Sequence, residues 1–244
     1  MRTGSFLAAL LALLPGSSFA DVSPPDTPAG NALSAWLAAF NSGDRATFES
    51  FTRVHAPWLV LDDEMQLRER TGGYDLLSIS QSDKFWIVFQ AREKTSSAQI
   101  AGRLIVRSYD PDHVTLLSLD PAGASSTVMA VDEAERARVI DGAVKLLNEF
   151  YVFPDIAKKV SAKLLAQRRQ GAYRNITDAE IFAIRLSDDM AGLSDDKHMG
   201  VDFFAVDQDL SEFGHQDLRY FLAAFGSTAS SAALSKACAS TRTL

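Results

Sequence analysis

The chain has 244 residues, 47% of them hydrophobic and 23% charged, and a formal net charge of −7 at pH 7. These values are ordinary for a soluble globular protein of one or two domains. An acidic chain without clustered cations cannot neutralise nucleic-acid phosphates well, so we expect no nucleic-acid partner. The single cysteine, Cys238, excludes an intramolecular disulfide, and no histidine that could activate a thiol nucleophile is recognisable beside it.

The first 20 residues have the three parts of a secretory signal peptide. Arg2 provides the positive charge, residues 6–14 form a short apolar core, and Ser18, Phe19 and Ala20 form the cleavage site. The apolar run is too short to span a bilayer, which takes about 20 residues. We therefore expect cleavage after Ala20, a periplasmic or secreted protein, and no membrane partner after cleavage.

The first half of the mature chain has the pattern of an α+β domain. A proline-containing linker is expected at residues 21–30. Apolar residues at helical spacing predict helices around residues 33–40, 48–54 and 62–70. The period then changes, and strands are expected at residues 75–80, 84–92, 97–109 and 113–119. Helices followed by such a strand meander predict an α+β domain over residues 31–120.

This order of elements, with the letters AW and FNSGD between residues 35 and 44, resembles the small NTF2-like module. In that fold a curved sheet and helices enclose a pocket, so the resemblance implies a ligand-binding site. The candidate lining residues are aromatic: Trp36, Phe40, Trp58, Tyr74, Phe85 and Trp86. The alternative is that the same six fill the interior, because aromatic side chains dominate ordinary cores.

A second unit follows a linker of small residues at 121–131. One helix is predicted from Asp132 to near Tyr151, because apolar residues recur at three- and four-residue steps. Pro154 favours the start of a second helix, which ends before Gly171. A capping box at residues 177–180 predicts the start of a third. The interpretation is a three-helix unit over residues 132–204 that ends in a strand at 199–204.

Four short motifs in this unit resemble those of a known protein family. They are EFYVFP at residues 149–154, GAY at 171–173, ITD at 176–178 and DDKH at 195–198. In this order they resemble the helical N-terminal region of S41 peptidases, the tail-specific or C-terminal processing proteases. The branch is the one that includes interphotoreceptor retinoid-binding protein. The resemblance covers residues 131–201, and NTF2-like modules precede S41 domains in some exported bacterial proteins.

The resemblance implies a serine-type peptidase whose full-length members act on a peptide or protein substrate and use no metal or other cofactor. The family's catalytic serine and lysine lie in a core well downstream of the DDKH motif, so the resemblance assigns no catalytic residue here. Residues 205–244 depart from the family pattern. A short helix is expected at 213–225, and residues 226–244, rich in alanine, serine and threonine, are expected to be poorly structured.

Other chemistry receives less support from the sequence. Ser227, Ser230, Ser231 and Ser235 lie near Lys236, but a serine nucleophile needs a base and oxyanion donors that are held rigidly. Asp195, Asp196 and His198 have the simpler interpretation of a polar helix end, and His55, His113 and His215 lack metal-site spacing. The neighbouring acids Asp188 and Asp189 are interpreted as solvent-facing groups that keep the protein soluble.

The sequence therefore favours an exported S41-like serine peptidase in a truncated form that lacks the catalytic core. The alternative is a non-enzymatic periplasmic or secreted module that binds a small apolar ligand or a peptide. A non-functional truncation product is the third possibility.

Overall fold

The computed structural model describes residues 22–123, 129–194, 196 and 199–202. Within these residues it has six helices and one four-stranded antiparallel sheet. The predicted α+β class is confirmed. None of the described helices is long and apolar enough to cross a membrane. The tail from residue 205, with its predicted helix at 213–225, lies outside the described residues.

Three helices precede the sheet: α1 (Pro28–Ser42), α2 (Arg45–His55) and α3 (Leu61–Thr71). The side chain of Thr27 accepts a hydrogen bond from the backbone of Gly30 and so caps α1, with Pro28 in its first turn. The predicted linker therefore ends at Thr27 rather than at residue 30. Asp44 caps α2 in the same way, by accepting from the backbone N–H of Thr47.

The sheet is a simple meander of β1 (Tyr74–Ser82), β2 (Trp86–Glu93), β3 (Gln99–Val106) and β4 (Val114–Pro121). Each strand pairs with the next, and Trp86 is opposite Ile105 in the register of the central pair. Gly102 is opposite Phe89, and a Cβ atom at Gly102 would overlap the Phe89 ring. The ring thus occupies space that only a glycine leaves open.

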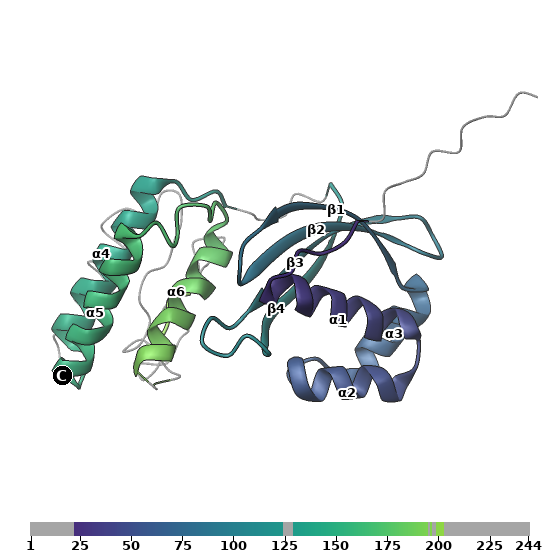
Figure 1. Cartoon of the computed structure of the whole chain (residues 1–244), viewed down its shortest axis with the longest axis horizontal. Helices are drawn as coiled ribbons and strands as arrows, with labels where there is room; N and C mark the ends of the chain where they lie inside the picture. The colour runs from purple at the N-terminus through teal and green to yellow at the C-terminus, as the bar shows by residue number, and fades with distance from the viewer. Residues whose placement is uncertain (1–21, 124–128, 195, 197–198, 203–244) are drawn as a thin grey trace, which may run out of the picture.

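Side chains alternate between the two faces of the central strands, as the strand period requires. On one face, Ile87, Phe89 and Leu104 belong to a buried cluster that includes α1. On the other face, Trp86 and Ile105 belong to a second buried cluster with the C-terminal helices. Figure 1 shows the sheet between α1–α3 on one side and the later helices on the other.

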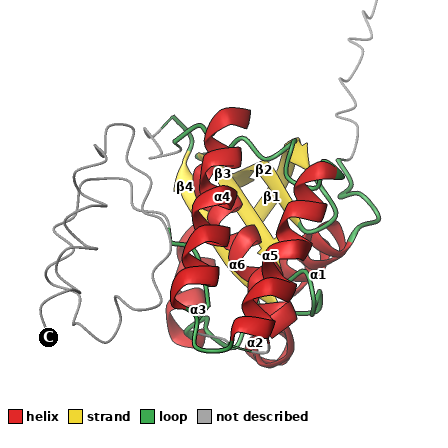
Figure 2. Cartoon of the chain, turned by 90° about the vertical axis from the view of Figure 1, so that its left-hand side faces the viewer, coloured by secondary structure: helices red, strands yellow, loops and turns green. Residues whose placement is uncertain are grey.

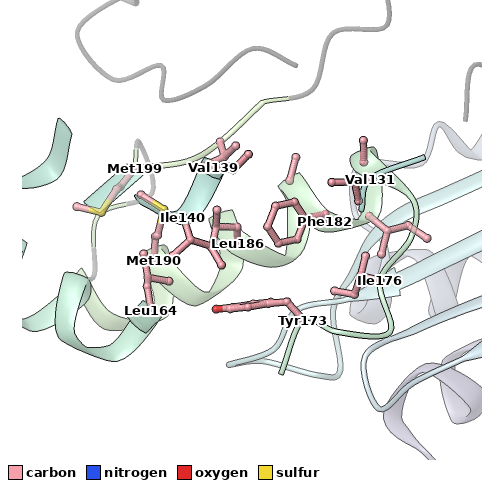
Figure 3. Close-up of a cluster of buried hydrophobic side chains, with 14 of the residues drawn as sticks. Val131, Val139, Ile140, Leu164, Tyr173, Ile176, Phe182, Leu186, Met190 and Met199 are labelled. Carbon is pink, nitrogen blue, oxygen red and sulfur yellow. The ribbon is translucent and has the colours of Figure 1, made fainter. Parts of the chain in front are cut away.

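The C-terminal helices are α4 (Glu133–Phe150), α5 (Pro154–Arg169) and α6 (Ala179–Ser194). They match the predicted three-helix unit, with Asp132 capping α4 and Pro154 opening α5. Helix α5 packs against both α4 and α6. Figure 2 shows these helices in front of the sheet, and Figure 3 shows the apolar side chains that they bury together. These include Ile140, Leu164, Phe182, Leu186 and Met190.

The start of α6 differs from the predicted capping box. Asp178, not Thr177, caps the helix, because its carboxylate accepts hydrogen bonds from the backbone N–H groups of Glu180 and Ile181. The carbonyl of Thr177 accepts from Val131 N–H, so its backbone is part of a bridge to the preceding segment. The Glu180 side chain points to β3 and does not cap the helix. Tertiary partners have overridden the local motif.

Of the predicted strand at 199–204, the structure shows a β-bridge at Gly200 and no longer strand within residues 199–202. Residues 203–204 lie outside the described set. The chain here returns to α6: Ser187 Oγ donates to the carbonyl of Val201 and accepts from its N–H. Met199 and Val201 are buried in the helical cluster. A side-chain hydroxyl thus holds the backbone of Val201 to α6.

Candidate functional site

Three of the six predicted pocket residues lie together in the first buried cluster. The ring of Trp36 stacks on Phe40 and on Tyr74 at centroid distances of 5.5 and 5.9 Å, and Phe40 stacks on Tyr74 at 5.4 Å. All three side chains are buried. Burial raises the pKa of the Tyr74 phenol, with Glu93 adding to the effect. The three rings form a contiguous aromatic stack between α1 and the start of β1.

The other three are not part of this stack, although Phe85 packs against the same buried cluster. Trp86 is on the opposite face of the sheet, in the cluster with the C-terminal helices. Phe85 is partly buried beneath the guanidinium of Arg185, whose Cζ lies 4.5 Å from the ring centroid. Trp58 is 46% exposed, and its indole N–H donates to the carbonyl of Val114. The structure thus does not bring all six around one space. Ligand binding stays a prediction, concentrated on the stacked group.

One atom of that group stands out. The indole Nε1 of Trp36 is buried and has no hydrogen-bond partner among the described residues. A buried N–H without a partner costs free energy, about 1–3 kcal/mol. The aromatic stack therefore contains one donor that an acceptor atom of a ligand could satisfy.

A second arrangement, at the junction of the sheet with α6, was not anticipated from the sequence. Asp188 and Asp189 are buried, and both face the segment after β3. The backbone N–H of Ser108 donates to Asp188 Oδ2 at 3.3 Å, and Ser108 Oγ donates to Asp189 Oδ1 at 3.1 Å. The interpretation of this pair as solvent-facing acids is wrong. Helix α6 places both carboxylates inward because a partner segment, distant in sequence, is there to receive them.

Among the described contacts, both carboxylate oxygens of Asp189 accept hydrogen bonds, whereas only Oδ2 of Asp188 does. Besides Ser108, Asp189 accepts from the Tyr173 hydroxyl at 2.9 Å and from Arg185 Nε at 3.1 Å. Among the described contacts, Asp188 accepts only the Ser108 N–H. Burial raises the pKa of Asp188 to about 6, an effect opposed by the Ser108 hydrogen bond and the Arg107 and Arg185 charges. Burial also raises the pKa of Tyr173, with Asp189 adding to it.

A third polar group fastens the other end of α6 to the sheet. Arg103 of β3 donates to Glu180 at 2.5 Å and lies 3.4 Å from the Asp178 carboxylate. It also donates to Ser118 of β4. Together with the Ser108 contacts, these ion pairs and hydrogen bonds hold α6 to the sheet at two points.

We call the first of these two points, the group of Ser108, Tyr173, Arg185, Asp188 and Asp189, the acidic junction.

The acidic junction contains the types of side chain found in proton-transfer sites, but these side chains bond to one another. Asp189 is neutralised by Arg185, and the Tyr173 hydroxyl donates to it. A general base must be within reach of a substrate proton, and these carboxylates are buried between two layers of the fold. The arrangement is therefore suited to fixing the helix on the sheet.

The remaining sequence candidates are separated from this junction or fall outside the described residues. Asp196 accepts from the Tyr151 hydroxyl at 3.0 Å, which ties the end of α6 to the α4–α5 turn. His55 Nδ1 lies 2.7 Å from the carbonyl of Asp112, and His113 Nδ1 lies 2.7 Å from the Asp110 carboxylate. No group of three or more metal-ligating side chains occurs in the part of the chain that the structure describes.

The candidates outside the described residues are Asp195, His198, His215, Ser227, Ser230, Ser231, Ser235, Lys236 and Cys238.

Residues 125–234 match the family model described as the N-terminal domain of Peptidase_S41 in eukaryotic IRBP. No curated protein and no solved structure matches the chain. The match includes α4, α5 and α6 and continues to residue 234, so the prediction that the chain departs from the family pattern from residue 205 is wrong over most of that length.

Proposed function

We propose that this chain serves peptide-bond hydrolysis as the non-catalytic N-terminal part of an S41-like serine peptidase, because residues 125–234 match the N-terminal domain of that family. The family match carries the proposal. The matched residues include α4, α5 and α6, and these helices bury one apolar cluster to which the sheet contributes Trp86 and Ile105. The substrate class is a peptide or protein.

The polar contacts of α6 support a positioning role for this part of the chain. Arg103 fixes the start of the helix, and Asp188 and Asp189 fix its second half. Two attachment points separated along one helix prevent it from pivoting on the sheet. A peptidase core that contacts these helices would then have a constant orientation relative to the first module.

Export is part of the same proposal. A signal peptide cleaved after Ala20 would deliver the chain to the periplasm or beyond the cell, where the proposed peptidase would meet its substrates. Amino-terminal sequencing of the protein recovered from the periplasmic or culture fraction tests this directly. We expect the sequence to begin at Asp21, and an intact Met1 in a cytoplasmic fraction would contradict it.

Cleavage of a fluorescent, unfolded casein by the purified chain tests where the chemistry resides. We expect hydrolysis at the rate of the buffer blank, because the family match is to an N-terminal domain. The variants Ser227→Ala, Ser230→Ala, Ser231→Ala and Ser235→Ala are measured beside it. Hydrolysis that one of these substitutions abolishes would place a nucleophile inside this chain and overturn the non-catalytic role.

The second candidate function is a binding module for a small apolar ligand, and the unpartnered indole N–H of Trp36 favours it. A ligand with an acceptor on an apolar body, such as octanal, would offer this donor a partner. Isothermal titration of the chain and of Trp36→Phe with octanal tests the idea. Loss of the N–H is expected to weaken binding about fivefold, in line with one hydrogen bond of about 1 kcal/mol. Equal titration curves for both proteins would remove this candidate.

A further inference from the structure

The turn between α4 and α5 presents three large apolar side chains to solvent. Phe150, Val152 and Phe153 are 56%, 66% and 58% exposed. They lie within four consecutive residues, so three exposed apolar side chains are concentrated at one turn. Single exposed apolar residues are common, but such a concentration points to an interaction surface. We call these three side chains the turn patch.

The turn that carries the patch is fixed in place. Tyr151, between the patch residues, is half-buried, and its ring meets that of Phe153 edge-on at 5.9 Å. Its hydroxyl donates to Asp196, the carboxylate that follows α6. Pro154 starts α5 immediately afterwards. The turn that carries the patch is therefore fixed, and Asp196, two residues after α6, is bonded to it.

We propose that the turn patch is the docking surface for residues 213–225 of the same chain. The family match treats residues 125–234 as one domain, so the patch and this segment belong to one unit. In the segment, Leu218, Phe221, Leu222 and Phe225 follow the i, i+3, i+4, i+7 spacing of a single apolar helical face. An apolar helical face and an exposed aromatic turn are complementary surfaces.

The connection is long enough for this contact. Asp196 lies against the turn, and the last described residue, Asp202, follows six positions later. The stretch from Asp202 to Phe213 spans up to about 36 Å when extended. Within one chain, so short a tether gives the segment a high effective concentration at the patch. The same two surfaces on separate copies would meet only at high protein concentration.

Photo-cross-linking of the purified full chain tests the proposal. p-Benzoylphenylalanine replaces Phe153 in one variant and, as a control, Tyr109 in another, because Tyr109 is also exposed but lies in the turn after β3. After irradiation, mass spectrometry maps the cross-linked peptides. We expect the probe at position 153 to link to residues 213–225 within the monomer, with a yield independent of protein concentration. The probe at position 109 is expected to give at least fivefold less of that link.

Two outcomes would overturn the proposal. One is a cross-link from position 153 that joins two chains and grows with concentration, which assigns the patch to a second copy. The other is equal linkage from positions 153 and 109, or none to residues 213–225. A second variant, Leu222→Asp with Phe225→Asp, changes no described residue and is expected to abolish the intramolecular link. Unchanged linkage in this variant would also refute the docking.

Discussion

Replacement of Asp188 by asparagine is expected to stabilise the protein at neutral pH. Burial raises the pKa of Asp188 to about 6 in the folded state, against an ordinary value of 3.8. The ionised form is therefore disfavoured by folding, and the cost at pH 7 is roughly 3 kcal/mol at 1.36 kcal/mol per pKa unit. Asparagine removes the charge and retains an oxygen that can accept the Ser108 N–H. Its amide N–H groups add donors to satisfy, so we expect a net gain of about 1–2 kcal/mol.

The pH dependence gives the decisive signature. Below pH 3.8 Asp188 is protonated in both states and contributes no difference. Between pH 3.8 and 6 the unfolded state releases the proton while the folded state keeps it, so the cost of folding grows with pH. Above pH 6 it is constant. The advantage of the variant over the wild type should therefore increase from pH 4 to pH 6 and then level off.

Urea unfolding of both proteins at pH 4.5, 6.0 and 7.5 measures this difference. Taking the difference cancels the titration of all groups that the two proteins share. Glu69→Gln, an exposed acid outside the acidic junction, serves as the matched control. A variant less stable than the wild type at pH 7.5, or an advantage that does not change between pH 4.5 and 7.5, would refute the burial argument for Asp188.

Three further substitutions test other contacts by urea or thermal unfolding. Asp189→Ala should lower the free energy of unfolding by about 3–5 kcal/mol, because it leaves Arg185 without its buried partner; a loss below 1 kcal/mol would contradict this. Gly102→Ala should cost about 1–3 kcal/mol, since the new methyl group overlaps the Phe89 ring. Gly142→Ala meets no atom within 4 Å inside α4 and should stabilise by about 0.5–1 kcal/mol. If both glycine variants shift stability in the same direction, the packing explanation fails.

Local signals in the sequence were sufficient for most elements. Proline at position 154, the acid at 132 and the glycine at 171 are start and stop signals that depend on neighbouring residues alone, and the structure confirms all three. The four strands lie near their predicted positions because aromatic and β-branched residues are concentrated in β2 and in the second half of β3. These features require no knowledge of the tertiary fold.

The acidic junction could not be predicted in this way. Asp189 is paired with Ser108, 81 positions earlier in the chain, and with Tyr173. Aspartate side chains are mostly exposed in proteins. Asp188 and Asp189 are buried because the segment after β3 packs against them, and that contact cannot be read from the neighbouring residues. The same reason explains the start of α6, where Glu180 binds Arg103 instead of capping the helix.

The predicted pocket residues show a second limit of prediction from the sequence. Residue type identifies Trp36, Phe40 and Tyr74 as a group with large apolar surfaces, but it does not specify which face of the sheet each neighbour occupies. Trp86 is opposite Ile105 and faces the C-terminal helices, so strand register separates it from Phe89, which faces the stack. A shift of register by one residue would have exchanged the two.

The central claim is that the chain is a non-catalytic part of an S41-like peptidase, and the protein isolated from its source cells tests it most directly. An antibody raised against residues 22–123 would recover that protein, and its cleavage of unfolded casein would be compared with a pre-immune control. The account predicts that the recovered protein is longer than this chain and hydrolyses casein, while the purified chain alone does not. A recovered protein of the same length without hydrolytic activity would contradict the claim and favour a binding module.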